Sequence, residues 1–203
     1  MPKPKKKAPA SNGKKVDSFC PEDVQAWREW LKKNHASVQS IWLILYKKNS
    51  GRPVISWSDA VDQALCFGWV DSIRRPINSH KFMQLFSQRK PAGTWSKINK
   101  EKVDRLIANG LMMPAGLHVI ERAKQNGSWN ILDTVESLSI PADLTKAFRK
   151  KPGSKKYFSS LSKSVKKMML SWLALAKRPE TRSKRVNEIA EQASIGKKPT
   201  PFQ

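Results

Sequence analysis

Residues 56–72, SWSDAVDQALCFGWVDS, constrain the fold more than any other stretch of the chain. Ser56, with Asp59 three residues later, resembles a capping box and predicts that a helix begins here. Apolar residues at helical spacing follow, and Gly68 is a residue type that commonly ends a helix. A β-branched and aromatic run comes directly after it, so the segment predicts a helix that stops at a glycine and leads into a strand.

The residues around this junction extend the same pattern. Residues 41–46, IWLILY, have the composition of a largely buried strand, and residues 49–53 predict a turn. Two further strands are expected at 69–76 and 81–89, joined by a hairpin turn. The other apolar stripes predict helices that cover about 21–34 (with Pro21 as the first helical residue), 97–110, 114–127, 141–152, 162–178 and 179–196. We therefore expect an α+β fold that is helix-rich, with a small antiparallel β-sheet in the N-terminal half and a C-terminal helical unit.

Charge is distributed unevenly along the 203 residues, which carry a net charge of +23. Residues 1–15 contain six lysines and no acidic residue, and residues 145–203 contain 16 basic residues against three acidic ones. The middle of the chain is nearly balanced. Cationic ends of this kind favour a polyanionic partner, either nucleic acid or an anionic membrane surface. The alternative is a charge excess that serves only solubility.

Composition divides the chain into four segments. We expect a disordered basic arm at 1–16, an α+β core at 17–130, a basic helical unit at 131–196 and a tail at 197–203. The sequence contains no run of about 18 apolar residues, so no transmembrane helix is predicted. The basic N-terminus leads into no apolar segment of a secretory signal, and two cysteines are too few for a disulfide framework. These features predict a cytoplasmic protein.

Several motifs occur in a fixed order: SWSDAVDQALCFGWVDS, FSQRK, TWSKINKEKVDRLI, MMPAG and AKRPETRSKRV. Together they resemble the YdeI/OmpD-associated family, also called bacteriocin-protection proteins, over about residues 17–196. The resemblance implies resistance to bacteriocins or cationic antimicrobial agents and a protein partner, an outer-membrane porin, but it supplies no catalytic residues. This sequence departs from the pattern at Met113, where threonine is expected, and at Gln88, where proline is expected. It also shows no export signal, although the family is sometimes described as periplasmic.

Candidate catalytic groups all have ordinary structural explanations. Cys66 lies near a predicted helix C-terminus, where the helix dipole disfavours a thiolate, and is better explained as a small buried apolar residue. Ser72 lacks the flanking glycines of a nucleophile elbow. His35, His80 and His118 have no metal-ligand spacing. We therefore predict no catalytic residue, no metal site and no cofactor.

The densest polar cluster combines WVDSIRR with FSQRKPAGTWSKINK. A groove lined by its indoles and cations would hold a phosphate, or a base stacked on Trp95. Ser96 is also expected to cap the following helix, whose N-terminus favours an anion. The alternative is that Asp71 pairs with an arginine while both tryptophans lie in the core. The predicted groove consists of Trp69, Asp71, Arg74, Arg75, Arg89, Lys90, Trp95, Ser96, Lys97 and Asn99.

A second cationic surface is expected on the last helices, where basic residues surround the apolar stripes. Such a surface attracts phosphates without reading a base sequence. The alternative is a solvated face with no partner. Its members are Lys166, Lys167, Lys177, Arg178, Arg182, Lys184 and Arg185.

These observations predict a soluble, non-enzymatic stress or bacteriocin-protection factor that binds a polyanion such as nucleic acid through its basic ends. Two alternatives stay open. One is an enzyme or small-ligand-binding protein that uses the groove around Asp71, Arg89 and Trp95. The other is an envelope-associated partner of a porin.

Overall fold

A computed structural model describes residues 16–52 and 55–203. Contacts between residues divide the chain into two units, which we describe separately. The sheet unit contains the described residues up to Arg89 together with Met112–Gly116, and the helical unit contains Lys90–Leu111 and Leu117–Gln203. The basic arm predicted at 1–16 lies, except for its last residue, outside the described residues. No helix in the described part of the chain is long and apolar enough to cross a membrane.

The sheet unit is built on four strands in the order β1-β2-β4-β3. Their bounds are β1 (Ser18–Phe19), β2 (Ser40–Tyr46), β3 (Trp69–Pro76) and β4 (Lys81–Gln88). The predicted hairpin is confirmed, because β3 and β4 pair antiparallel. β1 runs parallel to β2. The predicted small sheet is thus present, with β2, β4 and β3 antiparallel as expected. The parallel β1 makes the sheet mixed, and it was not predicted because a two-residue strand is too short to show a strand pattern in the sequence.

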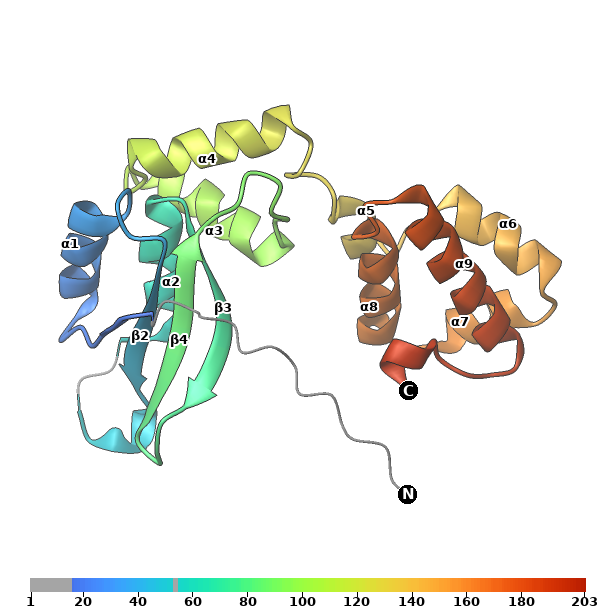
Figure 1. Cartoon of the computed structure of the whole chain (residues 1–203), viewed down its shortest axis with the longest axis horizontal. Coiled ribbons are helices and arrows are strands. Elements are labelled where there is room, and N and C mark those ends of the chain that lie inside the picture. Colours follow the sequence, from blue (N-terminus) through green and yellow to red (C-terminus); the bar gives the residue numbers. More distant parts are fainter. Residues whose placement is uncertain (1–15, 53–54) are drawn as a thin grey trace, which may run out of the picture. The chain divides into compact units, whose positions relative to one another are not determined.

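Two helices, α1 (Val24–Asn34) and α2 (Trp57–Cys66), lie against one face of this sheet (Figure 1). The Trp27 indole ties them together, since it donates to the Ala60 carbonyl at 3.0 Å and lies 5.5 Å from the Phe86 ring of β4. α1 begins three residues later than predicted. Asp23, expected within its first turn, is instead its N-cap and accepts a hydrogen bond from the Ala26 N–H at 2.7 Å.

The junction at residues 56–72 forms as predicted, with the Ser56 hydroxyl capping α2 and Gly68 in a left-handed conformation with a φ of 75°. The start of α4 (Pro114–Gln125) packs directly on the end of α2. The Cys66 carbonyl accepts the Met113 N–H at 3.1 Å, and a Cβ added to Gly116 would lie 2.4 Å from that same oxygen. This close approach is the physical reason for the glycine in MMPAG.

The helical unit contains α3 (Lys97–Ala108), the rest of α4, α5 (Asp133–Glu136), α6 (Ala142–Lys150), α7 (Ser154–Ser160), α8 (Lys163–Ala174), α9 (Pro179–Ser194) and the short 3₁₀ helix η2 (Thr200–Phe202). Sequence reasoning predicted the longer helices and missed α5 and α7, which span four and seven residues and are too short to show a helical period. In the segment predicted as a tail, the Phe202 ring packs edge-on against Trp172 at 5.5 Å.

The last five α-helices surround one apolar cluster (Figure 1). Its buried members come from α5 to α9 and are Val135, Leu144, Phe148, Phe158, Met169, Leu170, Leu173, Val186, Ile189, Ala190 and Ala193. The apolar stripes of these helices are therefore the faces that pack into this cluster.

Candidate functional site

The two tryptophans of the predicted groove are core residues. Trp69 is 0% exposed, and its indole nitrogen donates to the His35 carbonyl at 3.1 Å. Trp95 is 1% exposed and packs on Trp129 with 4.8 Å between ring centroids. Neither ring offers a free face to a base, as the alternative interpretation of the sequence expected.

Asp71 anchors a hydrogen-bond network at the side of the sheet that faces α2. Its carboxylate accepts from the Trp57 indole at 3.1 Å and from the Gln84 amide at 3.4 Å, and the Arg74 Nε donates to the Gln84 carbonyl oxygen at 3.2 Å. Burial lowers the pKa of Arg89 to about 10, and the charge of Asp71 partly offsets that effect. Arg89 therefore stays cationic at neutral pH. The structure thus brings Asp71, Arg74 and Arg89 together in an arrangement that serves packing.

The remaining groove residues are divided between the two units. In the helical unit, Ser96 is the predicted cap of α3 and accepts the Asn99 N–H at 3.3 Å. Lys97 forms an exposed ion pair with Glu101 at 3.7 Å, and Lys90 is exposed. In the sheet unit, Arg75 extends over the opposite side of the sheet from Arg74.

The cysteines and histidines form no reactive cluster. Burial raises the pKa of the Cys66 thiol, while a hydrogen bond from Arg28 acts in the opposite direction. Cys66 is therefore a protonated, buried residue, and Cys20 is exposed. Within the described ranges, no three side chains from His, Cys, Asp and Glu lie close enough together to bind a metal ion.

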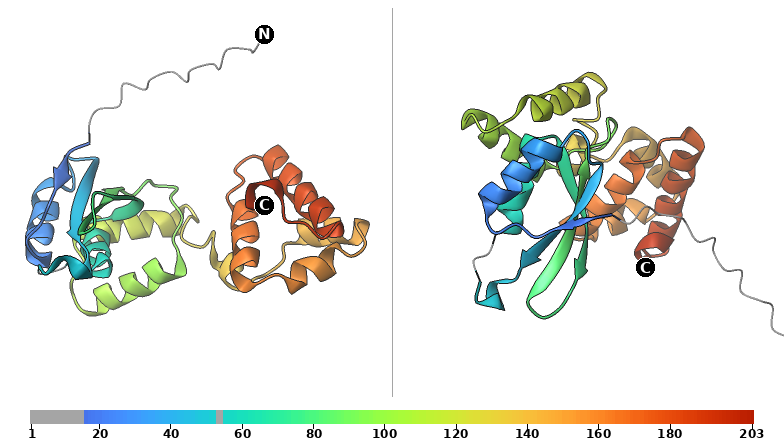
Figure 2. Two further views of the ribbon diagram at one scale, coloured as in Figure 1. Left: turned by 90° about the horizontal axis from the view of Figure 1, so that it is seen from below. Right: turned by 60° about the vertical axis from the view of Figure 1, so that its left-hand side comes forward.

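The face of the sheet opposite α1 and α2 is the strongest candidate site. Strand β2 alternates, with Ile41 and Leu43 buried and Trp42 and Tyr46 partly exposed. The strand predicted as largely buried is thus buried on one face and half-buried on the other. No described helix of the sheet unit covers this side (Figure 2). We name it the aromatic sheet face and define it by Trp42, Ile44, Tyr46, Met83 and Leu85, which strand register places on one side.

Three cations lie on the rings of the aromatic sheet face. Arg75 of β3 reaches across β4 and places its guanidinium 5.1 Å from the Trp42 ring centroid. Arg52 lies 5.4 Å and the Lys81 ammonium 4.7 Å from the Tyr46 centroid. None of the three forms an ion pair with a carboxylate in the described part of the chain. Their charges are therefore available to an external anion.

A hollow of about 360 Å³ adjoins the Tyr46 ring and Arg52, and Cys20, Pro21 and Glu22 complete its lining. Sequence reasoning missed this whole region. The signal was present in Trp42 and Tyr46, four residues apart on one strand and hence on one face. The sequence could not show which face the helices would cover.

Three of the seven cations predicted on the last helices are engaged within the helical unit. Lys167 pairs with Glu136 at 2.5 Å, and Arg182 forms a two-pronged pair with Asp143 at 2.6 and 3.2 Å. Arg185 donates to the Trp172 carbonyl and lies 4.9 Å from the centroid of its ring. The four other members form no ion pair with an acidic side chain among the described residues and are Lys166, Lys177, Arg178 and Lys184.

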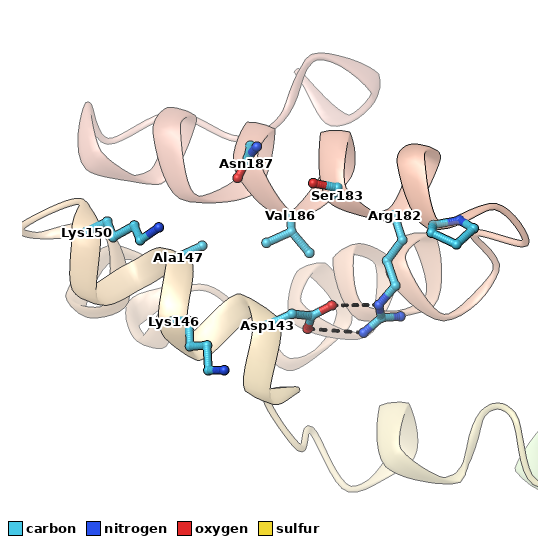
Figure 3. A pocket seen from close by; sticks show the side chains of 9 residues that line it. Asp143, Lys146, Ala147, Lys150, Arg182, Ser183, Val186 and Asn187 are labelled. Atoms are coloured by element: carbon cyan, nitrogen blue, oxygen red, sulfur yellow. Dashed lines mark hydrogen bonds and ion pairs between the residues drawn. The ribbon is translucent and has the colours of Figure 1, made fainter.

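A cleft of about 340 Å³ lies between α6 and α9 (Figure 3). The Asp143–Arg182 pair forms part of its lining, and Lys146, Lys150 and Val186 form another part. Burial acts to raise the pKa of Asp143, but hydrogen bonds from Arg182 and from the Leu144 N–H outweigh it, so this pKa is lowered. The two lysines could attract a small anion, whereas the pair itself holds the helices together.

Two family models match separate segments of the chain. Residues 19–119 match a domain of unknown function, DUF8412. Residues 137–196 match the family described as bacteriocin-protection, YdeI or OmpD-associated. We call residues 137–196, which give this second match, the YdeI/OmpD-associated domain. The match to the YdeI/OmpD-associated family therefore covers a shorter range than the residues 17–196 expected from sequence. The motifs SWSDAVDQALCFGWVDS and MMPAG lie within the segment that matches DUF8412. No curated protein and no solved structure matches the chain significantly.

The YdeI/OmpD-associated domain includes α6 to α9 and hence the cleft, the Asp143–Arg182 pair and most of the basic residues near the C-terminus. The aromatic sheet face lies in the other matched domain, whose description states no function. The two candidate surfaces therefore belong to different families.

Proposed function

We propose that this protein binds nucleic acid and that the aromatic sheet face is its principal contact surface. The observation that carries the proposal is a set of three cations, Arg52, Arg75 and Lys81, that lie over aromatic rings and form no ion pair with any described carboxylate. A nucleic acid supplies phosphates for such cations and flat bases for such rings.

The charge of the whole chain supports the same partner. The six lysines of residues 1–15 and the excess of basic residues after residue 144 add long-range attraction for any polyanion. Attraction of this kind raises association rates and non-specific affinity without selecting a base sequence. We therefore assign the basic ends an auxiliary role, in place of the principal role expected from sequence. The proposal carries with it a cytoplasmic location, where nucleic acid is accessible.

The description of the YdeI/OmpD-associated domain connects that part of the chain with bacteriocin protection. The two parts of the proposal are separable. Binding is a property of the full-length protein in solution, and protection is a property of cells.

The test is a titration of the full-length protein into a fluorescein-labelled oligonucleotide, followed by anisotropy at salt concentrations from about 50 to 200 mM. We expect binding at the lowest salt and a linear fall of log affinity with log salt, because each contacted phosphate releases a counterion. Absence of binding at the lowest salt concentration, or an affinity that does not change with salt, would contradict the proposal.

A further inference from the structure

The spacing and environment of the rings on the aromatic sheet face indicate which form of nucleic acid the protein binds. Trp42 and Tyr46 lie four residues apart on β2, so they are separated by about 13 Å along the strand. Ile44 lies between them, and Leu85 and Met83 lie opposite on β4. The result is an apolar strip with an aromatic ring at each end, on the side of the four-stranded sheet opposite α1 and α2.

Each ring of the strip lies beside a cation that forms no ion pair with an acidic side chain among residues 16–52 and 55–203. Arg75 lies over the Trp42 ring, and Arg52 and Lys81 lie over the Tyr46 ring. The Arg52 guanidinium also donates a hydrogen bond to the Tyr46 hydroxyl at 3.4 Å. A nucleotide satisfies both partners at once when its base takes the place of the cation on the ring and its phosphate binds the displaced cation. The hollow of about 360 Å³ beside Tyr46 provides space for a base at that end of the strip.

Rings presented in this way select against a duplex. In double-stranded nucleic acid the faces of the bases are covered by their stacked neighbours, and only base edges are exposed in the grooves. A four-stranded sheet is also broader than the two-stranded ribbon that a major groove admits. Stacking on Trp42 and Tyr46 thus requires bases whose faces are exposed.

We infer that the aromatic sheet face binds single-stranded nucleic acid, with bases stacked on Trp42 and Tyr46 and phosphates held by Arg75, Arg52 and Lys81. This inference rests on the proposed function and adds its substrate class. It assigns Trp42 and Tyr46 a role in binding that positive charge alone does not supply.

The experiment compares two labelled probes, an oligothymidylate of about 12 nucleotides and a duplex of the same length. The proteins are the full-length chain and its Trp42→Leu and Tyr46→Leu variants. Trp172→Leu is the matched control, because Arg185 lies over the Trp172 ring in the helical unit just as Arg75 lies over Trp42. Trp42→Phe and Tyr46→Phe keep an aromatic ring and separate loss of stacking from loss of folding.

We expect the oligothymidylate to bind more tightly than the duplex. Each leucine variant should lose about tenfold in affinity for the single strand, since stacking contributes about 1–3 kcal/mol per base. Duplex binding by the same variants, and single-strand binding by Trp172→Leu and by the phenylalanine variants, should change by less than about threefold.

Equal affinity of the two probes, or leucine variants that bind the single strand as the unmodified chain does, would overturn this inference and leave the proposed function intact. Failure of the unmodified protein to bind either probe would overturn both. A parallel loss of affinity for both probes in the leucine variants alone would also count against stacking, because it indicates a shared electrostatic or folding defect.

Discussion

The two units of this protein use their basic residues differently. In the helical unit, Arg182 and Lys167 pair with carboxylates, and Arg185 binds the end of a helix. In the sheet unit, Arg75, Arg52 and Lys81 lie on aromatic rings and have no acidic partner in the described part of the chain. A count of positive charge alone favours the C-terminal helices as the binding surface. The contacts weaken that preference, because three of the seven cations predicted there already bind a carboxylate or a backbone carbonyl and are less available to a phosphate.

The units also differ in the contacts that stabilise each of them internally. The sheet unit depends on a close backbone approach, in which Gly116 packs on the Cys66 carbonyl at the end of α2. In the helical unit, α6 and α9 are connected by two ion pairs, Asp143–Arg182 and Lys151–Glu191. Close packing tolerates no added atom, whereas solvent-screened ion pairs contribute modestly. The following predictions test this difference.

The largest effect on stability is expected from Gly116→Ala. The new Cβ would lie 2.4 Å from the Cys66 oxygen and 2.8 Å from the Leu65 oxygen, so two backbone segments would have to separate. We expect a loss of about 3 kcal/mol in the free energy of unfolding, measured by urea denaturation with tryptophan fluorescence.

The control for this variant is Gly153→Ala at the start of α7. Gly153 has a φ of 80°, but no atom lies within 4 Å of an added Cβ, so only backbone strain of about 1 kcal/mol is expected. Equal losses of unfolding free energy in the two variants would show that the close approach at Gly116 does not add to the stability of the sheet unit.

A smaller, pH-dependent effect is expected from Asp143→Asn. Because the pKa of Asp143 is lowered in the folded protein, its ion pair stabilises the helical unit fully above the ordinary aspartate pKa of 3.8, and this stabilisation is lost as the pH falls through the lowered value. The side chains of Arg182 and Asp143 are 34% and 41% exposed, so screening limits the expected loss to about 1 kcal/mol at neutral pH.

Thermal denaturation of both proteins at a series of pH values checks this prediction. The difference between Asp143→Asn and the unmodified chain should shrink as the solution becomes acidic. Glu191→Gln, which removes the more exposed pair with Lys151, should change stability by less than Asp143→Asn at every pH. A difference for Asp143→Asn that persists unchanged in acid would contradict the assigned role of the ion pair.

Much of the fold could be predicted from local chemistry. The caps at Ser56, Ser96 and Ser162 and the proline at the start of α9 mark helix ends through interactions within a few residues. The parallel pairing of β1 could not be predicted, because its partner lies more than twenty residues away and the strand itself has two residues. α7 was missed for a related reason, since its position depends on packing of Phe158 into a distant cluster.

The candidate site was harder to predict than the fold. Sequence reasoning grouped Trp69 and Trp95 with nearby cations, but tertiary packing buries both rings. Trp42 and Tyr46 were overlooked because a strand that is apolar on both faces gives no sign of which face remains open. Only the placement of α1 and α2 on the other side determines that.

The most direct test of the central claim compares two triple variants with the same loss of charge. One removes the sheet cations (Arg52→Ala, Arg75→Ala and Lys81→Ala), and the other removes unpaired cations of the helical unit (Lys177→Ala, Arg178→Ala and Lys184→Ala). Affinity for a single-stranded oligonucleotide is measured across a salt series. We predict a loss of about a hundredfold and a salt slope reduced by about 2 for the sheet triple, and a change within about threefold for the helical triple. Equal losses, or a greater loss in the helical triple, would contradict the account.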